Sequence, residues 1–188
     1  AGLNLNDTLW SAKALLECPD LVRKVHYDYY AAGANAVEAC SYQATEAAFA
    51  RKGIEKAEAS RLIRLSGELV REAKNDVLLE HPEWDPADLL TAGSIGPYGA
   101  YLADGSEYTG AYDLTREEYY AFHQLRLDEL LNSGMDILAI ETQPRFDEIE
   151  ALLAMIADRD ITCWVTVTLK DGDMPDGTKL EVLAKCLD

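Results

Sequence analysis

Positive charge is scarce in this sequence. Its 188 residues include 17 Lys and Arg against 34 Asp and Glu, which gives a formal net charge of −17. Nucleic acids and anionic membrane surfaces attract clustered cations, so we expect neither as a partner. The hydrophobic share of 48% argues against disorder, because a chain this apolar has enough side chains to bury in a core. We therefore expect a single folded domain.

Cysteines and long apolar runs are also scarce. The four cysteines are far apart and form no Cys-x-x-Cys pair, so the sequence has neither a zinc-ribbon nor a redox motif: Cys18, Cys40, Cys163 and Cys186. No apolar run approaches the roughly 18–20 residues of a membrane span. The first residues also lack the basic and apolar parts of a secretory signal. We therefore expect a cytoplasmic protein with free, buried thiols.

What the sequence does contain is a regular alternation of helical and strand patterns. Capping residues and apolar residues at helical spacing predict a short helix from near Asn6, and further helices over 19–33, 44–51, 55–77, 114–134, 146–157 and from 180 onward. Apolar runs predict strands over 36–41, 89–95, 136–141 and 161–169. Strands that are apolar on both faces and alternate with helices indicate an α/β domain with a parallel sheet. A closed (β/α)₈ barrel typically needs about 250 residues, so there is room for only part of one.

The carboxyl ends of the four predicted strands are polar. They are followed or ended by Ser41-Tyr42-Gln43, Ser94-Ile95-Gly96, Glu141-Thr142-Gln143 and Thr166-Val167-Thr168. Parallel α/β folds bind their ligands at these strand ends. The sequence therefore predicts a site for a polar ligand there.

Glu141 is the sharpest candidate in that site. It directly follows the apolar run from Ile137 to Ile140, and a carboxylate buried at such a point needs a cation or hydrogen-bond donors. Its partner could be a substrate ammonium, a local Lys or Arg, or the amino end of the following helix. From the residues alone, a functional partner (the substrate ammonium) and a structural partner (a local side chain or helix end) are about equally well supported.

The stretch from Gly96 to Tyr112 is the second candidate, because a long segment without predicted helix or strand is usually functional. Ser94 and Gly96 could present a hydroxyl and a backbone donor to a ligand carboxylate, or Gly96 could simply make a tight turn with Pro97. Four tyrosines could form a lid over a ligand or pack a folded surface loop: Tyr98, Tyr101, Tyr108 and Tyr112.

Several motifs together resemble the homocysteine S-methyltransferases, especially the branch that uses S-methylmethionine or S-adenosylmethionine as methyl donor. The resemblance rests on Ser41-Tyr42-Gln43-Ala44-Thr45, on Phe122-His123, on Glu141-Thr142 followed by Pro144 and, above all, on the glycine- and tyrosine-rich residues 92–108. It implies a (β/α)₈ TIM barrel, of which residues 1–188 resemble strands two to five.

The resemblance also implies an activity. In this family, zinc bound by cysteine thiolates holds the thiol of homocysteine as a thiolate, which takes a methyl group from a sulfonium donor and gives methionine. By resemblance, Glu141 would hold the amino group of homocysteine. The same pocket would be lined by Ser41, Tyr42, Gln43 and Ser94.

No residue of this sequence receives a catalytic or metal-binding role. The family's first strand would precede these residues and its zinc cysteines would follow them, so we expect the 188 residues on their own to be inactive. A partial barrel has two open sheet edges, which favour association, so a homo-oligomer is one expected form. The alternatives are a non-catalytic barrel used for ligand binding or assembly, and another barrel enzyme that acts on an amino acid.

Overall fold

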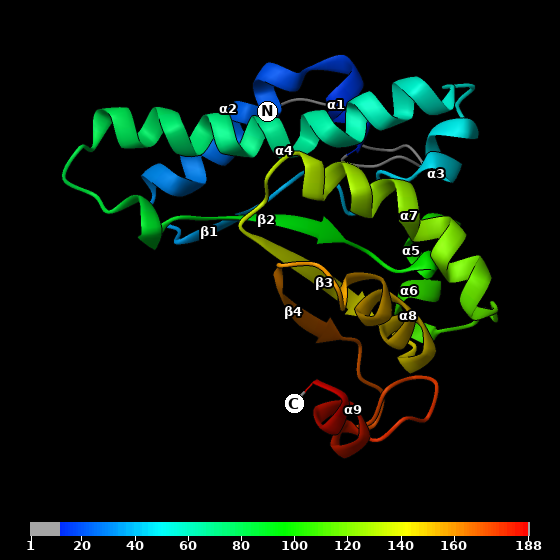
Figure 1. The fold of residues 1–188 in the computed structure, drawn as a ribbon. Helices are drawn as coiled ribbons and strands as arrows, with labels where there is room; N and C mark the ends of the chain where they lie inside the picture. Colours follow the sequence, from blue (N-terminus) through cyan, green and yellow to red (C-terminus); the bar gives the residue numbers. More distant parts are fainter. Residues whose placement is uncertain (1–11, 188) are drawn as a thin grey trace.

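The computed structural model describes residues 12–187 (Figure 1), and each helix and strand predicted between residues 19 and 187 is present. The helices are α1 (Lys13–Glu17), α2 (Pro19–Ala31), α3 (Glu46–Ala50), α4 (Lys56–Glu80), the 3-10 turn η2 (Pro86–Asp88), α5 (Tyr98–Leu102), α6 (Ser106–Thr109), α7 (Arg116–Asn132), α8 (Phe146–Ile156) and α9 (Leu180–Leu187). The start of the helix predicted near Asn6 lies outside the described residues. Within the described part, no helix is long and apolar enough to cross a membrane.

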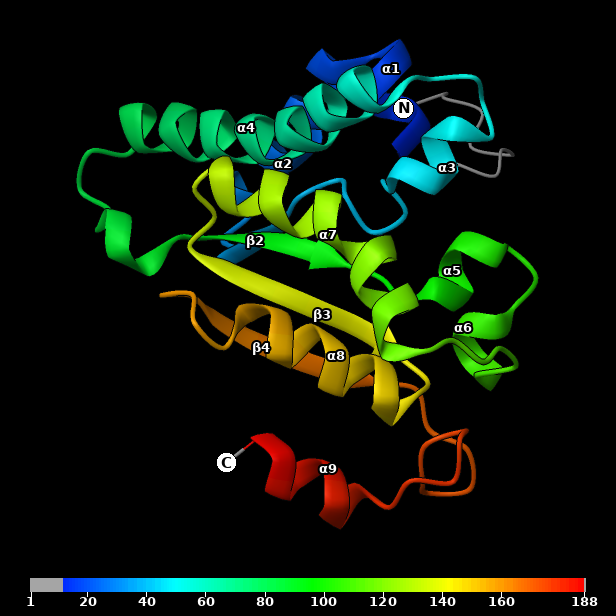
Figure 2. The same cartoon turned by 45° about the vertical axis from the view of Figure 1, so that its right-hand side comes forward.

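Four strands form one parallel sheet in the order in which they follow along the chain: β1 (Ala36–Glu38), β2 (Leu90–Ile95), β3 (Ile137–Gln143) and β4 (Thr162–Val167). Crossovers between parallel strands are right-handed. Because the strand order never reverses, the connecting helices fall on one face, where α4, α7 and α8 lie in Figure 1. The predicted α/β fold with four parallel strands is confirmed. In Figure 2, β2 and β3 point toward α5 and α6.

The two faces of the sheet carry different residues. Successive side chains of a strand point to opposite faces. The face under the helices joins one apolar core, whose fully buried members include Leu62, Val70, Leu130, Leu138 and Ile140. On the other face, the register pairs Glu38 with Ala92, and Ser94 with Ala139. Polar side chains on that face therefore approach one another at the carboxyl ends of the strands.

Both edges of the sheet are open. Within residues 12–187, β1 pairs only with β2, and β4 pairs only with β3. Each residue of β4 is accordingly at least partly exposed, whereas β2 is buried along most of its length. The chain thus forms the wall of an incomplete barrel.

The segment from Gly96 to Tyr112 is more ordered than the sequence predicts. The expectation that it lacks regular structure is wrong, because it contains α5 and α6. Gly99 allows these two helices to touch: a Cβ atom there would lie 2.5 Å from the backbone nitrogen of Glu107. The side chain of Asp104 accepts a hydrogen bond from the Ser106 nitrogen at 3.0 Å and so starts α6. Gly99 therefore permits close packing of the two helices and does not mark a flexible loop.

The four thiols are outside any disulfide, as predicted, but they are not all buried. Cys18, Cys40 and Cys163 are partly buried, whereas Cys186 is exposed on α9. Cys40 lies in a turn rather than in a strand, because β1 ends at Glu38, three residues before the predicted end. None of these thiols is paired in a disulfide.

Candidate functional site

A pocket of about 390 Å³ lies at the carboxyl ends of β1, β2 and β3. It is lined by Glu38, Ala39, Tyr42, Ser94, Tyr108, Glu141 and Thr142. Three of the residues that the sequence analysis proposes for substrate binding therefore meet in it: Tyr42, Ser94 and Glu141. Among residues 12–187, those that line it include two carboxylates and no Lys or Arg.

Glu141 has a hydroxyl partner but no cation. The Ser94 Oγ donates a hydrogen bond of 2.6 Å to Glu141 Oε1. Burial raises the pKa of Glu141 to about 7; the hydrogen bond from Ser94 opposes this rise, and the nearby Glu38 carboxylate adds to it. The charge of the buried Arg126 also opposes this rise, but Arg126 donates its hydrogen bonds to other groups. The first nitrogen of helix α8, that of Phe146, donates to Asp176 Oδ2 at 2.6 Å, so Glu141 does not cap this helix.

A bulge in β3 shapes the floor of the pocket. Consecutive residues of a regular strand face opposite sides, yet both Glu141 and Thr142 line the pocket. The register with β4 shifts between Ile140 and Gln143, and Thr142 has a φ of 55°. A β-branched residue rarely adopts this conformation, and here the Thr166 Oγ1 stabilises it by accepting a 2.9 Å hydrogen bond from the Thr142 nitrogen. Bulges of this kind often re-aim side chains at active sites.

Ser41 and Gln43 lie behind the pocket rather than in its lining. Ser41 is fully buried, and its hydroxyl donates to the Ser94 carbonyl at 2.7 Å. The Gln43 amide donates to the Ala100 carbonyl at 2.8 Å. These two side chains therefore hold the end of β2 and helix α5 in place, while Tyr42 between them faces the pocket.

A buried arginine that the sequence analysis does not single out fixes the pocket from behind. Arg126 of α7 is 1% exposed. Its guanidinium donates to the Tyr42 carbonyl and the Gly96 carbonyl, both at 2.6 Å, and to His123 Nδ1 at 2.8 Å. Burial lowers the pKa of Arg126 to about 10, so the side chain stays charged at neutral pH. One cation thus ties together the chain segments that follow β1 and β2.

The charge of Arg126 is balanced through His123 by a buried carboxylate. Because His123 Nδ1 accepts from Arg126, its Nε2 carries the proton and donates to Glu148 Oε1 at 2.8 Å. Glu148 is also fully buried and accepts from the Tyr98 nitrogen and the Tyr112 hydroxyl, both at 2.6 Å. The signal in the sequence is the pair His123 and Arg126 on the helix face that also carries Leu130.

The sequence leaves two roles open for the tyrosines of residues 96–112, a lid over a ligand or the packing of a folded loop, and the structure shows tyrosines in both positions. Tyr98 packs against Tyr101 and Tyr112 with ring centroids 5.5 Å apart, and against Phe122 at 4.9 Å. These rings form the interior of a folded loop. Tyr108, by contrast, lines the pocket.

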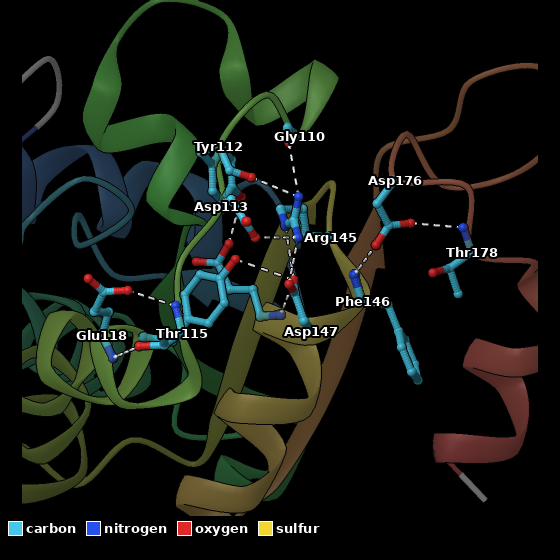
Figure 3. Close-up of polar contacts among 12 residues, drawn as sticks. Gly110, Tyr112, Asp113, Thr115, Glu118, Arg145, Phe146, Asp147, Asp176 and Thr178 are labelled. Atoms are coloured by element: carbon cyan, nitrogen blue, oxygen red, sulfur yellow. Dashed lines mark hydrogen bonds and ion pairs between the residues drawn. The ribbon is translucent and has the colours of Figure 1, made fainter.

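Arg145 anchors this loop to the start of α8, as Figure 3 shows. Its guanidinium donates to the Tyr112 carbonyl at 2.7 Å and the Gly110 carbonyl at 3.4 Å. The same group forms a two-pronged ion pair with Asp147, at 2.6 and 3.0 Å, and reaches Asp113 at 3.4 Å. The hydrogen bonds that Arg145 donates to Asp147 raise the pKa of Arg145. These contacts hold the carboxyl end of the segment that carries Tyr108 against the start of α8.

We expect Arg145→Gln to lower the free energy of unfolding of the full-length protein by about 1–3 kcal/mol, since charged and two-pronged hydrogen bonds are lost together. Urea denaturation measures this change. Arg159→Gln is the matched control, because Arg159 is 45% exposed and pairs with Asp128 only at 3.3 Å; its effect should stay within about 0.5 kcal/mol. Equal effects of the two substitutions would contradict the anchoring role.

Glu38 and Ala39 also line the pocket, although the sequence analysis does not propose them as site residues. Glu38 is the one charged residue of the predicted strand over 36–41, which is the signal that could have marked it. Ala39 follows it and gives the pocket a small wall. Within residues 12–187, no group of three or more His, Cys, Asp or Glu is placed to hold a metal ion.

Comparison with known proteins establishes the family. The family model for homocysteine S-methyltransferase matches residues 2–188. This chain belongs to the homocysteine S-methyltransferase family. It is 50% identical over 181 residues to a homocysteine S-methyltransferase of Escherichia coli (strain K12), covering 95% of this chain and 58% of that protein. It is 44% identical over 190 residues to homocysteine S-methyltransferase YbgG of Bacillus subtilis (strain 168), covering 100% of this chain and 60% of that protein.

Solved structures agree with the family assignment. The crystal structure of the homocysteine methyltransferase MmuM from Escherichia coli, in its metallated form, matches 99% of this chain with a TM-score of 0.93 and 49% identity. The match covers 65% of the MmuM chain. The likeness to the homocysteine S-methyltransferases and the expectation of a partial TIM barrel are both confirmed. This chain spans about three fifths of the length of these relatives, as the 58% and 60% coverages show.

Proposed function

We propose that the full-length protein containing this chain transfers a methyl group from S-methylmethionine or S-adenosylmethionine to the thiol of homocysteine, giving methionine. The observation that carries the proposal is the Glu141 carboxylate, which lies in a pocket whose lining provides it with a hydroxyl but no cation. An amino-acid substrate brings the missing cation as its ammonium group. Membership of the family supports the same substrate class.

The bond changes define what the protein must hold in place. The homocysteine sulfur, once deprotonated, attacks the methyl carbon of the donor, and the bond from that carbon to the sulfonium sulfur breaks. The electron pair of the broken bond stays on the donor sulfur, which becomes a neutral thioether. The thiol proton leaves to solvent. Such an in-line transfer depends on the distance between the two sulfur atoms, and on the angle that they form at the methyl carbon, more than on proton transfer.

The residues of this chain would supply the positioning. Glu141 would fix the ammonium of homocysteine, with Ser94 holding the carboxylate in its orientation and Tyr42 and Tyr108 forming the walls. Zinc, which the family resemblance implies, would activate the thiol of homocysteine when bound. The described residues present no metal-binding group, so we assign no ligand to zinc within residues 12–187.

Methionine formation tests the proposal. The full-length protein, purified with zinc, should form methionine from L-homocysteine and at least one of the two sulfonium donors. Supplying each donor separately identifies the one that is used. A correctly folded, zinc-loaded protein that forms no methionine with either donor would overturn the proposal and favour the non-catalytic alternative.

We also expect the 188 residues alone to form no methionine and to bind no zinc with stoichiometric occupancy, because a structural or catalytic zinc site needs at least about three protein ligands. Dialysis against zinc followed by elemental analysis measures the binding, and the same methionine assay measures activity. The full-length protein is the positive control. Methionine formation by the 188 residues would contradict this expectation.

A further inference from the structure

The pocket contains a second carboxylate that the proposed function has not used. Glu38 on β1 and Glu141 on β3 stand on opposite sides of Ser94 on β2. The register explains this: Glu38 pairs with Ala92, Ser94 lies two residues beyond Ala92 on the same face, and Ser94 pairs with Ala139, two residues before Glu141. Both carboxylates line the same pocket, and the charge of Glu38 adds to the rise in the pKa of Glu141.

No cation in the pocket lining separates these two acids. The nearest guanidinium is that of Arg126, which is buried and already donates to two backbone carbonyls and to His123. Tyr42 and Tyr108 line the same space, and burial raises the pKa of Tyr42 to about 12, so it stays neutral. The like charge of Glu38 therefore adds to the effect of burial in keeping a proton on Glu141.

We propose that Glu38 is a specificity-determining residue that forms, with Glu141, a two-carboxylate subsite for the ammonium group of the substrate. The ammonium displaces the proton that Glu141 holds when no substrate is bound. The inference rests on the proposed function, since it concerns the same pocket and the same amino-acid substrate. It adds a residue from a different strand and couples ammonium binding to proton release.

The direction of the pH dependence follows from the acids involved. Below about pH 7 Glu141 holds its proton, and the ammonium must displace it, so binding weakens as the pH falls. Above that pH the proton has already left, and binding no longer releases it. Between pH 8 and pH 6 the KM for homocysteine is expected to rise about ten-fold, as the ionised fraction of a group with this pKa falls.

Calorimetry with L-methionine isolates this proton. Methionine carries the same ammonium group as homocysteine, but its thioether has no proton to lose. Titration of the full-length protein in PIPES and in ACES gives the number of protons released, because both buffers work from pH 6 to pH 8 and differ in ionisation enthalpy. We expect roughly 0.9, 0.5 and 0.1 protons at pH 6, 7 and 8 for a group with a pKa of about 7.

Three variants and one ligand serve as comparisons. Glu38→Gln removes the like charge and should reduce the release at pH 7 to below about 0.2 protons, because the pKa of Glu141 then falls. Glu38→Asp keeps the charge and should keep a release near that of the wild type. Glu150→Gln changes an exposed carboxylate of α8 and should match the wild type. The analogue 4-methylthiobutanoate lacks the amino group and should release no proton.

The outcomes separate the inference from the proposed function. A wild-type protein that forms methionine, yet releases no proton at pH 6 or 7, would overturn the inference alone. Equal proton release by the wild type and Glu38→Gln would do the same. A folded, zinc-loaded protein that neither binds methionine nor forms it would overturn the proposed function.

Discussion

Replacing Glu141 by Gln in the full-length protein is expected to lower kcat/KM for homocysteine about 5- to 150-fold, which corresponds to about 1–3 kcal/mol for the loss of a charged hydrogen bond. Gln has the shape of Glu, and the Ser94 hydroxyl can still donate to its amide oxygen. What the variant lacks is the negative charge that would face the substrate ammonium. Steady-state kinetics with homocysteine as the varied substrate measure the change.

Two controls make the result specific to the ammonium group. Glu150→Gln changes a carboxylate on the exposed side of α8 and should leave the kinetics unchanged. Des-amino homocysteine, 4-mercaptobutanoate, should react poorly with the wild type, and Glu141→Gln should not impair that residual reaction further. If Glu141→Gln left both KM and kcat for homocysteine unchanged, Glu141 would have no role in binding it.

The largest loss of stability is expected from Arg126→Met, at about 3–5 kcal/mol in the free energy of unfolding, because the change leaves the buried Glu148 carboxylate without its compensating cation. The carbonyls of Tyr42 and Gly96 also lose their donor. Urea denaturation of the full-length protein measures the loss. Arg61→Met is the matched control, since Arg61 is 58% exposed and pairs with Glu58 on its own helix.

A second substitution tests whether charge causes the loss. In the Arg126→Met background, Glu148→Gln removes the uncompensated charge and should restore part of the stability, whereas alone it should destabilise. Such a sign change is the mark of two coupled sites. A loss below about 1 kcal/mol for Arg126→Met would show that the network is not a major source of stability.

The sequence predicts the sheet and its helices because both depend on local periodicity. It also points to Glu141, because a carboxylate that directly follows an apolar strand is conspicuous along the chain. The two short helices α5 and α6 are missed because their glycines are typical of loops. Only the fold shows that the Gly99 backbone meets that of Glu107.

The rest of the site could not be predicted because its partners come from distant elements. Arg126 contacts residues 84 and 30 positions away in the chain. Glu38 approaches Glu141 only through the registers of β1 with β2 and of β2 with β3. A one-residue slip in either register would turn one of the acids to the other face. The sequence contains no local signal that sets these registers.

A crystal structure of the full-length protein with L-homocysteine tests the central claim most directly. We predict that the amino nitrogen of the ligand lies within about 3.2 Å of a carboxylate oxygen of Glu141, as expected for a charged hydrogen bond. Homocysteine bound with its amino group directed away from Glu141, or bound outside the pocket between Ser94 and Tyr108, would contradict the account.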